Sequence, residues 1–311
     1  MRKPTTVAAV VGADFHASDK PPAARATEVD WLKTQAGYWK QARDLCDAHG
    51  VPFLIAGDVF DDGWRQSRCS PALINMVLRN MPRECYGVPG QHDLPHHRLD
   101  AIKQSAFYTL VEAGKLTYLE PDKPVEVGGK VPLRLWGFPW GVPIAPLTDP
   151  HDMVLEVAVV HAYVWVKGKG HAEAAPEARL KNLRKNMMGY DAVVIGDNHT
   201  PWEVAGKPYV WNNGGFLRRR VDEKDHKPRL GLLQSDGSVV PHYLNIKRDK
   251  FAVPDPDNEV AEDGVIEFVK SLRELTDSTL DFEDAVLRWL ERKAVSEGVR
   301  RKVLEAMGGG K

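Results

Sequence analysis

Five short apolar runs, rich in valine, each end directly before a polar segment that carries Asp or His. The runs are residues 5–12, 51–56, 85–88, 154–160 and 192–195. Continuous apolar runs of this length are typical of parallel strands that are buried on both faces. Stretches with the apolar spacing of helices lie between or after them, at residues 28–49, 71–80, 99–113 and 178–188. Alternation of strand and helix predicts an α/β fold built on sheets with parallel strands.

The rest of the chain predicts two hairpins and a separate helical end. Residues 124–127 and 132–137 flank one glycine-containing turn, and residues 229–234 and 238–244 flank another. Such turns between apolar runs are typical of hairpins. After Phe251 a break rich in Pro and Asp precedes segments with helical periodicity. We therefore predict a main domain at 1–250, a linker at 251–261 and a helical extension at 262–311.

Composition limits the location and the partners of the protein. The 311 residues carry a formal net charge of −1, so no overall positive field attracts nucleic acid, and any DNA contact needs a local patch or bound metals. No apolar run approaches the roughly 18 residues of a membrane-spanning helix, and the first residues do not have the pattern of a signal peptide. The three cysteines lack metal-type spacing and are expected to be reduced. We expect a cytoplasmic protein without a membrane partner.

The polar segments after the five apolar runs carry a mixed set of oxygen and nitrogen donors. They are Asp14-Phe15-His16, the residues 57–61 (GDVFD), the residues 90–93 (GQHD), His161, and the residues 196–199 (GDNH). Each segment alone is a weak signal, but five in order at strand ends predict one site, because strand ends are where α/β proteins place sites. Such donors suit Mn²⁺, Fe²⁺, Zn²⁺ or Mg²⁺. Two divalent ions about 3.5–4 Å apart can clamp a phosphate and create a hydroxide nucleophile near neutral pH.

The order of these segments resembles the calcineurin-like metallophosphoesterase family, whose motifs are D-x-H, G-D-x-x-D, G-N-H-D/E, H and G-H-x-H. The resemblance spans Asp14 to His199 and implies a four-layer αββα sandwich. It implies a first metal held by Asp14, His16 and His199 and a bridging Asp58. It further implies a second metal completed by Gln91, His161 and Asp197. His92 would act as general acid or stabilise the charge of the leaving oxygen, and Asp61 would hydrogen-bond His92 and orient it.

Two positions depart from the family motifs. Gln91 stands where Asn is usual, and Asp197 stands where the first His of G-H-x-H is usual. The additional carboxylate favours harder ions such as Mn²⁺ or Mg²⁺ over Zn²⁺ at the second site. We therefore predict an enzyme with two divalent ions that prefers Mn²⁺, with Mg²⁺, Fe²⁺ and Zn²⁺ as the other candidates. The alternative is a weakened second site, or a metal-binding relic.

Residues 211–220 (WNNGGFLRRR) and the hairpin that follows resemble the N-P-G-S-x-x-R segment and closing hairpin of SbcD-type DNA repair nucleases. The match is loose, because Asn-Gly-Gly replaces Asn-Pro-Gly-Ser. The resemblance implies that Arg218, Arg219 and Arg220 contact DNA phosphates. The alternative is a solvated basic segment paired with the acidic residues that follow it. The loop at 167–171, and Trp140 or Trp165 as stacking partners, are further candidates for a nucleic-acid groove.

These resemblances imply a metal-dependent DNA exo/endonuclease that hydrolyses phosphodiester bonds. The alternative is a small-molecule phosphodiesterase or phosphomonoesterase of the same class, and a non-catalytic metal-binding scaffold is the third reading. The implied partners are DNA and either an SbcC-type ATPase, bound through the helical extension, or a second copy of the chain.

Overall fold

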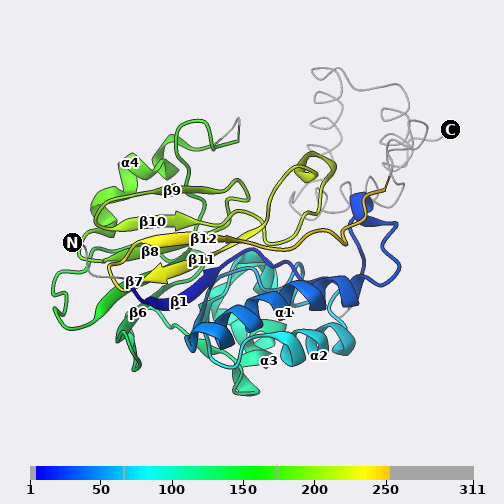
Figure 1. Cartoon of the computed structure of the whole chain (residues 1–311), viewed down its shortest axis with the longest axis horizontal. Coiled ribbons are helices and arrows are strands. Elements are labelled where there is room, and N and C mark those ends of the chain that lie inside the picture. Colours follow the sequence, from blue (N-terminus) through cyan, green and yellow to red (C-terminus); the bar gives the residue numbers. More distant parts are fainter. Residues whose placement is uncertain (1–4, 66, 172–173, 253–311) are drawn as a thin grey trace, which may run out of the picture. The chain divides into compact units, whose positions relative to one another are not determined.

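The computed structural model describes residues 5–252, except residues 66, 172 and 173 (Figure 1). The predicted helical extension at 262–311 lies outside the described residues, as does the predicted linker beyond Ala252. The domain boundaries therefore stay predictions.

The first sheet contains the strands that begin and end the described chain. Its order is β12-β11-β1-β2-β3-β4. The strands β1 to β4 run parallel, and β11 joins β1 and β12 in antiparallel pairs. Their bounds are Val7–Gly12 (β1), Phe53–Ala56 (β2), Cys85–Val88 (β3), Thr117–Tyr118 (β4), Arg229–Gln234 (β11) and Val239–Tyr243 (β12). The predicted hairpin at 229–244 is confirmed as β11 and β12.

The second sheet is built from the middle of the chain. Its order is β5-β6-β7-β8-β10-β9. The strands β6, β7, β8 and β10 are parallel to their neighbours, and β5 and β9 add antiparallel edges. Their bounds are Val125–Val127 (β5), Leu133–Phe138 (β6), Leu155–His161 (β7), Ala192–Gly196 (β8), Trp202–Val204 (β9) and Tyr209–Asn212 (β10).

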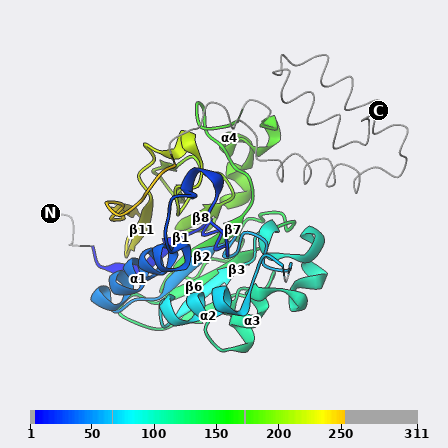
Figure 2. The same ribbon diagram turned by 90° about the vertical axis from the view of Figure 1, so that its right-hand side faces the viewer.

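The two sheets pack face to face, and helices cover their outer faces. Apolar side chains of β1 and β2 meet those of β6 and β7 in a buried core between the sheets. The helices α1 (Trp31–His49), α2 (Pro71–Asn80) and α3 (Ala106–Glu112) cover the first sheet, and α4 (Leu180–Leu183) lies against the second. Figures 1 and 2 show α1–α3 on one side of the sheets and α4 on the other. The predicted four-layer αββα sandwich is confirmed.

Local signals set the helix ends. The side chain of Asp30 accepts from the backbone of Lys33 to cap α1, and the helix ends at Gly50, whose φ of 64° is the left-handed conformation that glycine tolerates. The predicted helix at 99–113 is wrong in its continuity: a 3-10 turn ends before Ser105, whose side chain caps α3. The predicted helix at 178–188 is likewise split, because only α4 is α-helical and a 3-10 turn follows it. Among the described helices, none has the length and apolarity that crossing a lipid bilayer requires.

Candidate metal centre

The polar segments predicted from the sequence meet where the carboxyl ends of β1, β2, β3, β7 and β8 come together. Four of their residues leave the strands with positive φ angles: Asp14 (59°), His16 (44°), Asp58 (51°) and Asp197 (85°). This conformation is uncommon for residues other than glycine and is often found at functional sites. The turns it forms direct these side chains from separate strands toward one region.

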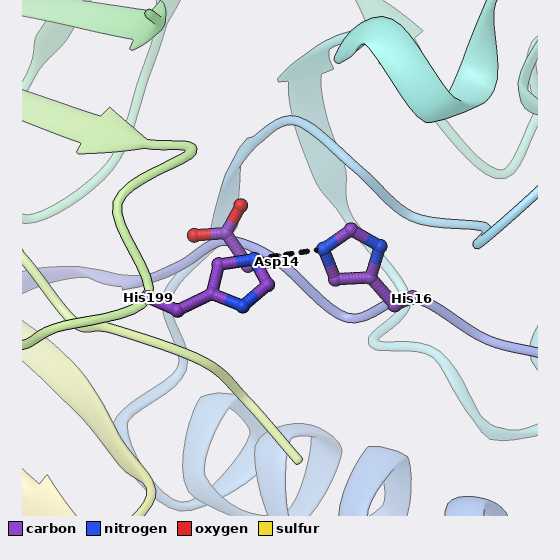
Figure 3. A group of neighbouring side chains, drawn as sticks. All are labelled: Asp14, His16 and His199. Atoms are coloured by element: carbon purple, nitrogen blue, oxygen red, sulfur yellow. Dashed lines mark hydrogen bonds between the residues drawn. The ribbon is translucent and has the colours of Figure 1, made fainter. Parts of the chain in front are cut away.

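The first convergent group consists of Asp14, His16 and His199, whose ligand atoms lie within 4.8 Å of one another. Figure 3 shows the three side chains facing one another, with Nε2 of His16 and Nε2 of His199 at 3.0 Å. Asp14 and His16 are buried, whereas His199 is exposed. Burial lowers the pKa of His16 to about 3 and also lowers the pKa of His199. Both rings therefore stay neutral near pH 7, which is the form that binds a metal.

The second convergent group consists of Asp14, Asp58 and His161, all of them buried. The Oδ2 atom of Asp58 lies 3.4 Å from Nε2 of His161 and 3.6 Å from Nε2 of His16. One carboxylate oxygen thus lies between a histidine of each group. This is the position that a bridging ligand needs.

The two carboxylates have the properties of metal ligands without their cation. Asp14 Oδ2 and Asp58 Oδ2 are buried and form no hydrogen bond with the described residues, although buried polar atoms are normally paired. Burial raises the pKa of Asp14 well above its usual range. A divalent cation would satisfy both oxygens and remove the cost of burying the charge, so these residues fit the predicted metal ions.

The backbone orients His161 for the same purpose. Its Nδ1 lies 2.7 Å from the carbonyl oxygen of Ala56, which can only accept, so Nδ1 carries a hydrogen and Nε2 faces the site. Burial disfavours the charged ring, but the Asp58 carboxylate outweighs this and raises the pKa of His161 to about 10. In the metal-free protein, a proton thus occupies the nitrogen that a metal would take.

Gln91 and Asp197 lie together at the edge of the second group. Gln91 donates from Nε2 to Asp197 Oδ1 at 2.7 Å, and its Oε1 lies 2.7 Å from Nε2 of His161. The backbone N–H of Asp197 donates to Asp14 Oδ1 at 2.9 Å. The amide oxygen of Gln91 therefore reaches the second group. The Asp197 carboxylate belongs to neither convergent group of the described residues, so its predicted role as a ligand stays a prediction.

His92 lies at the side of the site nearest to His16. Its backbone N–H donates to Asp58 Oδ1 at 3.0 Å, and its ring lies edge-on to His16 with centroids 4.9 Å apart. Its Nδ1 is 2.9 Å from the backbone carbonyl of Asp61. Asp61 therefore contacts His92, but through its main chain. This corrects the expectation that the carboxylate of Asp61 orients the ring.

The carboxylate of Asp61 instead joins His16 and Arg219. Its Oδ1 accepts from Nη1 of Arg219 at 2.7 Å and lies 3.4 Å from Nδ1 of His16. Burial raises the pKa of this carboxyl, but the contacts with His16 and Arg219 outweigh burial and hold the pKa far below its usual range. Asp61 thus positions a candidate metal ligand and holds an arginine beside the site.

The three consecutive arginines have three different environments. Arg219 is held beside the site by Asp61. Arg218 is buried, and its guanidinium contacts Asp249 at 2.8 Å and the carbonyl of Lys224 at 2.7 Å. The expectation that Arg218 binds substrate is corrected, because burial and these partners engage its donors. Arg220 is exposed and paired with an acidic residue two positions later, which is the alternative arrangement considered above.

The sequence gave no separate role to Asp93, the last residue of the segment at 90–93. Asp93 is wholly buried and accepts three backbone N–H bonds: from Val59 at 3.2 Å, Phe60 at 2.9 Å and Gly90 at 3.0 Å. It therefore ties the loop after β2 to the loop after β3. Its place inside a recognisable motif was the available signal. A side chain at Gly90 would overlap Asp58, so this position must stay a glycine.

The aromatic candidates from the sequence are only partly near the site. The ring of Trp140 lies 6.4 Å from that of His161, at the edge of the second group. Trp165 is engaged elsewhere: its ring is covered by Arg179, and its Nε1 donates to the carbonyl of Ala175 at 2.9 Å. Trp165 is therefore part of a packed surface segment.

Comparison with known proteins gives matches in structure alone. The sequence matches no known family profile and no curated protein. The phosphopantetheinyl hydrolase PptH from Mycobacterium tuberculosis is 12% identical, with a TM-score of 0.42, over 82% of this chain and 98% of that chain. The calcineurin-like phosphoesterase YfkN from Bacillus subtilis is 14% identical, with a TM-score of 0.43, over 83% of this chain and 93% of that chain. Vps29 from Chaetomium thermophilum is 15% identical, with a TM-score of 0.33, over 79% and 92%. At TM-scores below 0.5 these similarities decide nothing about the reaction, and the case for a function rests on the metal centre.

Proposed function

We propose that this protein is a two-metal phosphoesterase of the calcineurin-like class that hydrolyses phosphodiester bonds in DNA. The observation that carries the proposal is the position of Asp58. Its unpaired Oδ2 lies between His16 and His161, each of which belongs to a separate group of candidate ligands. A single buried carboxylate between two ligand groups is suited to holding two cations.

The residues divide between the two ions as the resemblance implies. Asp14, His16 and His199 would hold the first ion, and Asp58 would contact both. Gln91 and His161 would hold the second ion, with Asp197 beside them. When bound, the ions would polarise the phosphate and supply a nucleophile at neutral pH. The oxygen-rich second site supports a preference for Mn²⁺ over Zn²⁺.

His92 is placed to serve the leaving group. A carbonyl can only accept, so Nδ1 of His92 carries the hydrogen that points to Asp61, and Nε2 is left to exchange a proton. The contact between its backbone and Asp58 fixes the ring beside the metal ligands. Arg219, held by Asp61, adds a positive charge that can contact a phosphate oxygen.

A small phosphodiester or phosphomonoester is the second candidate substrate. The observation that favours it is that only Arg219, of the three predicted DNA-binding arginines, lies at the site. The predicted SbcC-type ATPase partner, or a second copy of the chain, would bind through residues 262–311, which lie outside the described part of the structure.

Purified protein with labelled single- and double-stranded DNA, or with a chromogenic phosphodiester, tests the proposal. With Mn²⁺ the wild type should hydrolyse both DNA and the ester, and Asp58→Ala should hydrolyse neither. Hydrolysis of the ester with intact DNA would support the small-molecule alternative. Activity that survives in Asp58→Ala would refute the two-metal proposal.

The role of His92 is tested by separating turnover from binding. His92→Ala should bind Mn²⁺ normally and lose about 10²–10⁴-fold in kcat, which is the usual contribution of a general acid. The matched control is His96→Ala, because His96 is exposed and packs on Trp64 away from the ligands. Normal turnover by His92→Ala would exclude the assigned role.

A further inference from the structure

A basic surface surrounds α4 and the loop that precedes it. Residues 164–190 contain six Lys or Arg residues and two Glu residues, a local net charge of +4 in a chain with an overall charge of −1. A local excess of this size was the condition that the overall charge set for any contact with a polyanion.

Four of these cations converge on one hollow of about 250 Å³ beside α4. They are Lys167, Arg179, Lys181 and Arg184. The hollow is also lined by Val166, Leu180 and Val204, so apolar surface lies among the charges. Apolar surface next to several cations suits a ligand with alternating charged and uncharged parts, such as the phosphates and nucleosides of a nucleic-acid strand.

The cations of the hollow have no acidic partner among the described residues. Arg179 covers the ring of Trp165, with its guanidinium carbon 5.3 Å from the ring centre, and no described carboxylate forms an ion pair with any of the four. Elsewhere in the molecule, by contrast, Arg25, Arg218 and Arg219 are each paired with an aspartate. Uncompensated charge on this surface therefore remains available for an anion.

The basic surface is attached directly to the metal centre. Asn198 lies between the two candidate ligands of its loop, and its Nδ2 donates to the carbonyl of Val164 at 2.9 Å and to that of Lys169 at 3.0 Å. The loop that carries Lys167 and Lys169 is thus fastened to the motif at 196–199. A polyanion held by this loop would lie next to the metal ligands.

We infer that this α4 basic surface, formed by Lys167, Lys169, Arg179, Lys181 and Arg184, binds the phosphate backbone of a nucleic-acid strand that extends from the metal centre. The inference rests on the proposed phosphodiesterase function and names the part of the protein that selects a polymeric substrate. A small ester at the metals has no second phosphate to reach the hollow. The surface therefore separates DNA from small substrates.

The test compares two triple variants that remove the same charge. One is Lys167→Gln/Lys181→Gln/Arg184→Gln, and the matched control changes three exposed, ion-paired cations on other surfaces. The control is Lys40→Gln/Arg83→Gln/Lys123→Gln. Binding of fluorescein-labelled single-stranded and duplex DNA is measured by anisotropy in EDTA, which prevents cleavage. Each protein is measured at roughly 50 and 200 mM salt, the range in which phosphate contacts dominate.

The first triple variant should bind DNA at least 10-fold more weakly than the wild type at low salt. Loss of three phosphate contacts should reduce the fall in affinity for single strands between the two salt concentrations by about 20-fold, at a slope of roughly 0.7 per contact. The control should bind like the wild type. Hydrolysis of the chromogenic phosphodiester should be unchanged in both variants, because no changed residue belongs to the metal centre.

Three outcomes would overturn the inference: wild-type DNA affinity in the first variant, an equal loss in the control, or binding of the wild type to phosphatidylserine vesicles but not to DNA. A wild type that binds DNA through this surface but hydrolyses no ester would refute the proposed function alone. The binding and hydrolysis assays thus fail independently.

Discussion

Substitution of Asp93 by Asn should destabilise the protein although the two side chains have almost the same shape. The Oδ2 atom of Asp93 accepts the N–H groups of Val59 and Gly90, and Oδ1 accepts that of Phe60. Asn keeps one acceptor oxygen and places an NH₂ group in the other position. In the less costly orientation, the amide nitrogen of the new side chain faces the N–H of Phe60.

The size of the effect follows from the number of buried groups left unpaired. That orientation leaves two donors without an acceptor, each at a cost of about 1–3 kcal/mol. We expect a loss of about 3 kcal/mol, which for a protein of this size lowers Tm by roughly 6–12 °C. Both tied loops carry candidate ligands, so Mn²⁺ affinity should fall as well.

Calorimetry at pH 8 in the presence of EDTA measures this loss without a contribution from bound metal. Burial and the nearby charge of Asp58 raise the pKa of Asp93 to about 7, so at pH 8 the wild-type carboxyl is mainly ionised and accepts with both oxygens. The matched control is Asp100→Asn, at an exposed carboxylate, which should change stability by less than about 0.5 kcal/mol. A Tm for Asp93→Asn within 2 °C of the wild type, about one-third of the smallest shift expected, would refute this role of Asp93.

Three further predictions concern parts of the protein outside the metal centre. Arg218→Ala should lower the free energy of unfolding in urea by about 3–5 kcal/mol, because it leaves a buried carboxylate unpaired, whereas Arg220→Ala should have almost no effect; similar losses would contradict this. Burial raises the pKa of Glu28, but its bonds with Arg25 outweigh burial and lower it. The stability from this pair should therefore be present above about pH 4.3, the usual pKa of Glu, and be lost as pH falls below it. Urea unfolding of Glu28→Gln should lack that loss, and an unchanged pH profile would argue against the pair. Burial raises the pKa of the Cys46 thiol to about 12, so this thiol should react with Ellman's reagent at pH 8 only after unfolding, and rapid labelling of the native protein would contradict its burial.

The strands could be predicted because fully buried strands leave a direct pattern in the sequence. The run that forms β7 is buried at every position, and the run that forms β2 is too. The helix at 99–113 could not be predicted in detail. Its apolar spacing continues across Ser105, but the side chain of Ser105 caps a new helix there. A capping serine inside an apolar pattern competes with a continuous helix, and tertiary contacts decide the outcome.

The region of the candidate site could be predicted because the carboxyl ends of parallel strands meet at one edge, which places Asp14, Asp58 and His161 together. Contacts between residues far apart in sequence could not be predicted. Arg218 resembles a surface cation in its local sequence, and its burial depends on Asp249, which lies 31 residues away. The contact of Asp61 with His92 depends on which atom of Asp61 the loop presents, and residue type does not specify that.

The central claim is that the site holds two divalent ions with Asp58 between them. Crystals grown with Mn²⁺ and measured near the manganese absorption edge would locate each ion directly in an anomalous difference map. We predict two peaks, one beside His16 and His199 and one beside His161, with the Asp58 carboxylate in contact with both. A single peak, no peak, or two peaks that do not share Asp58 would contradict the two-metal site and the function proposed from it.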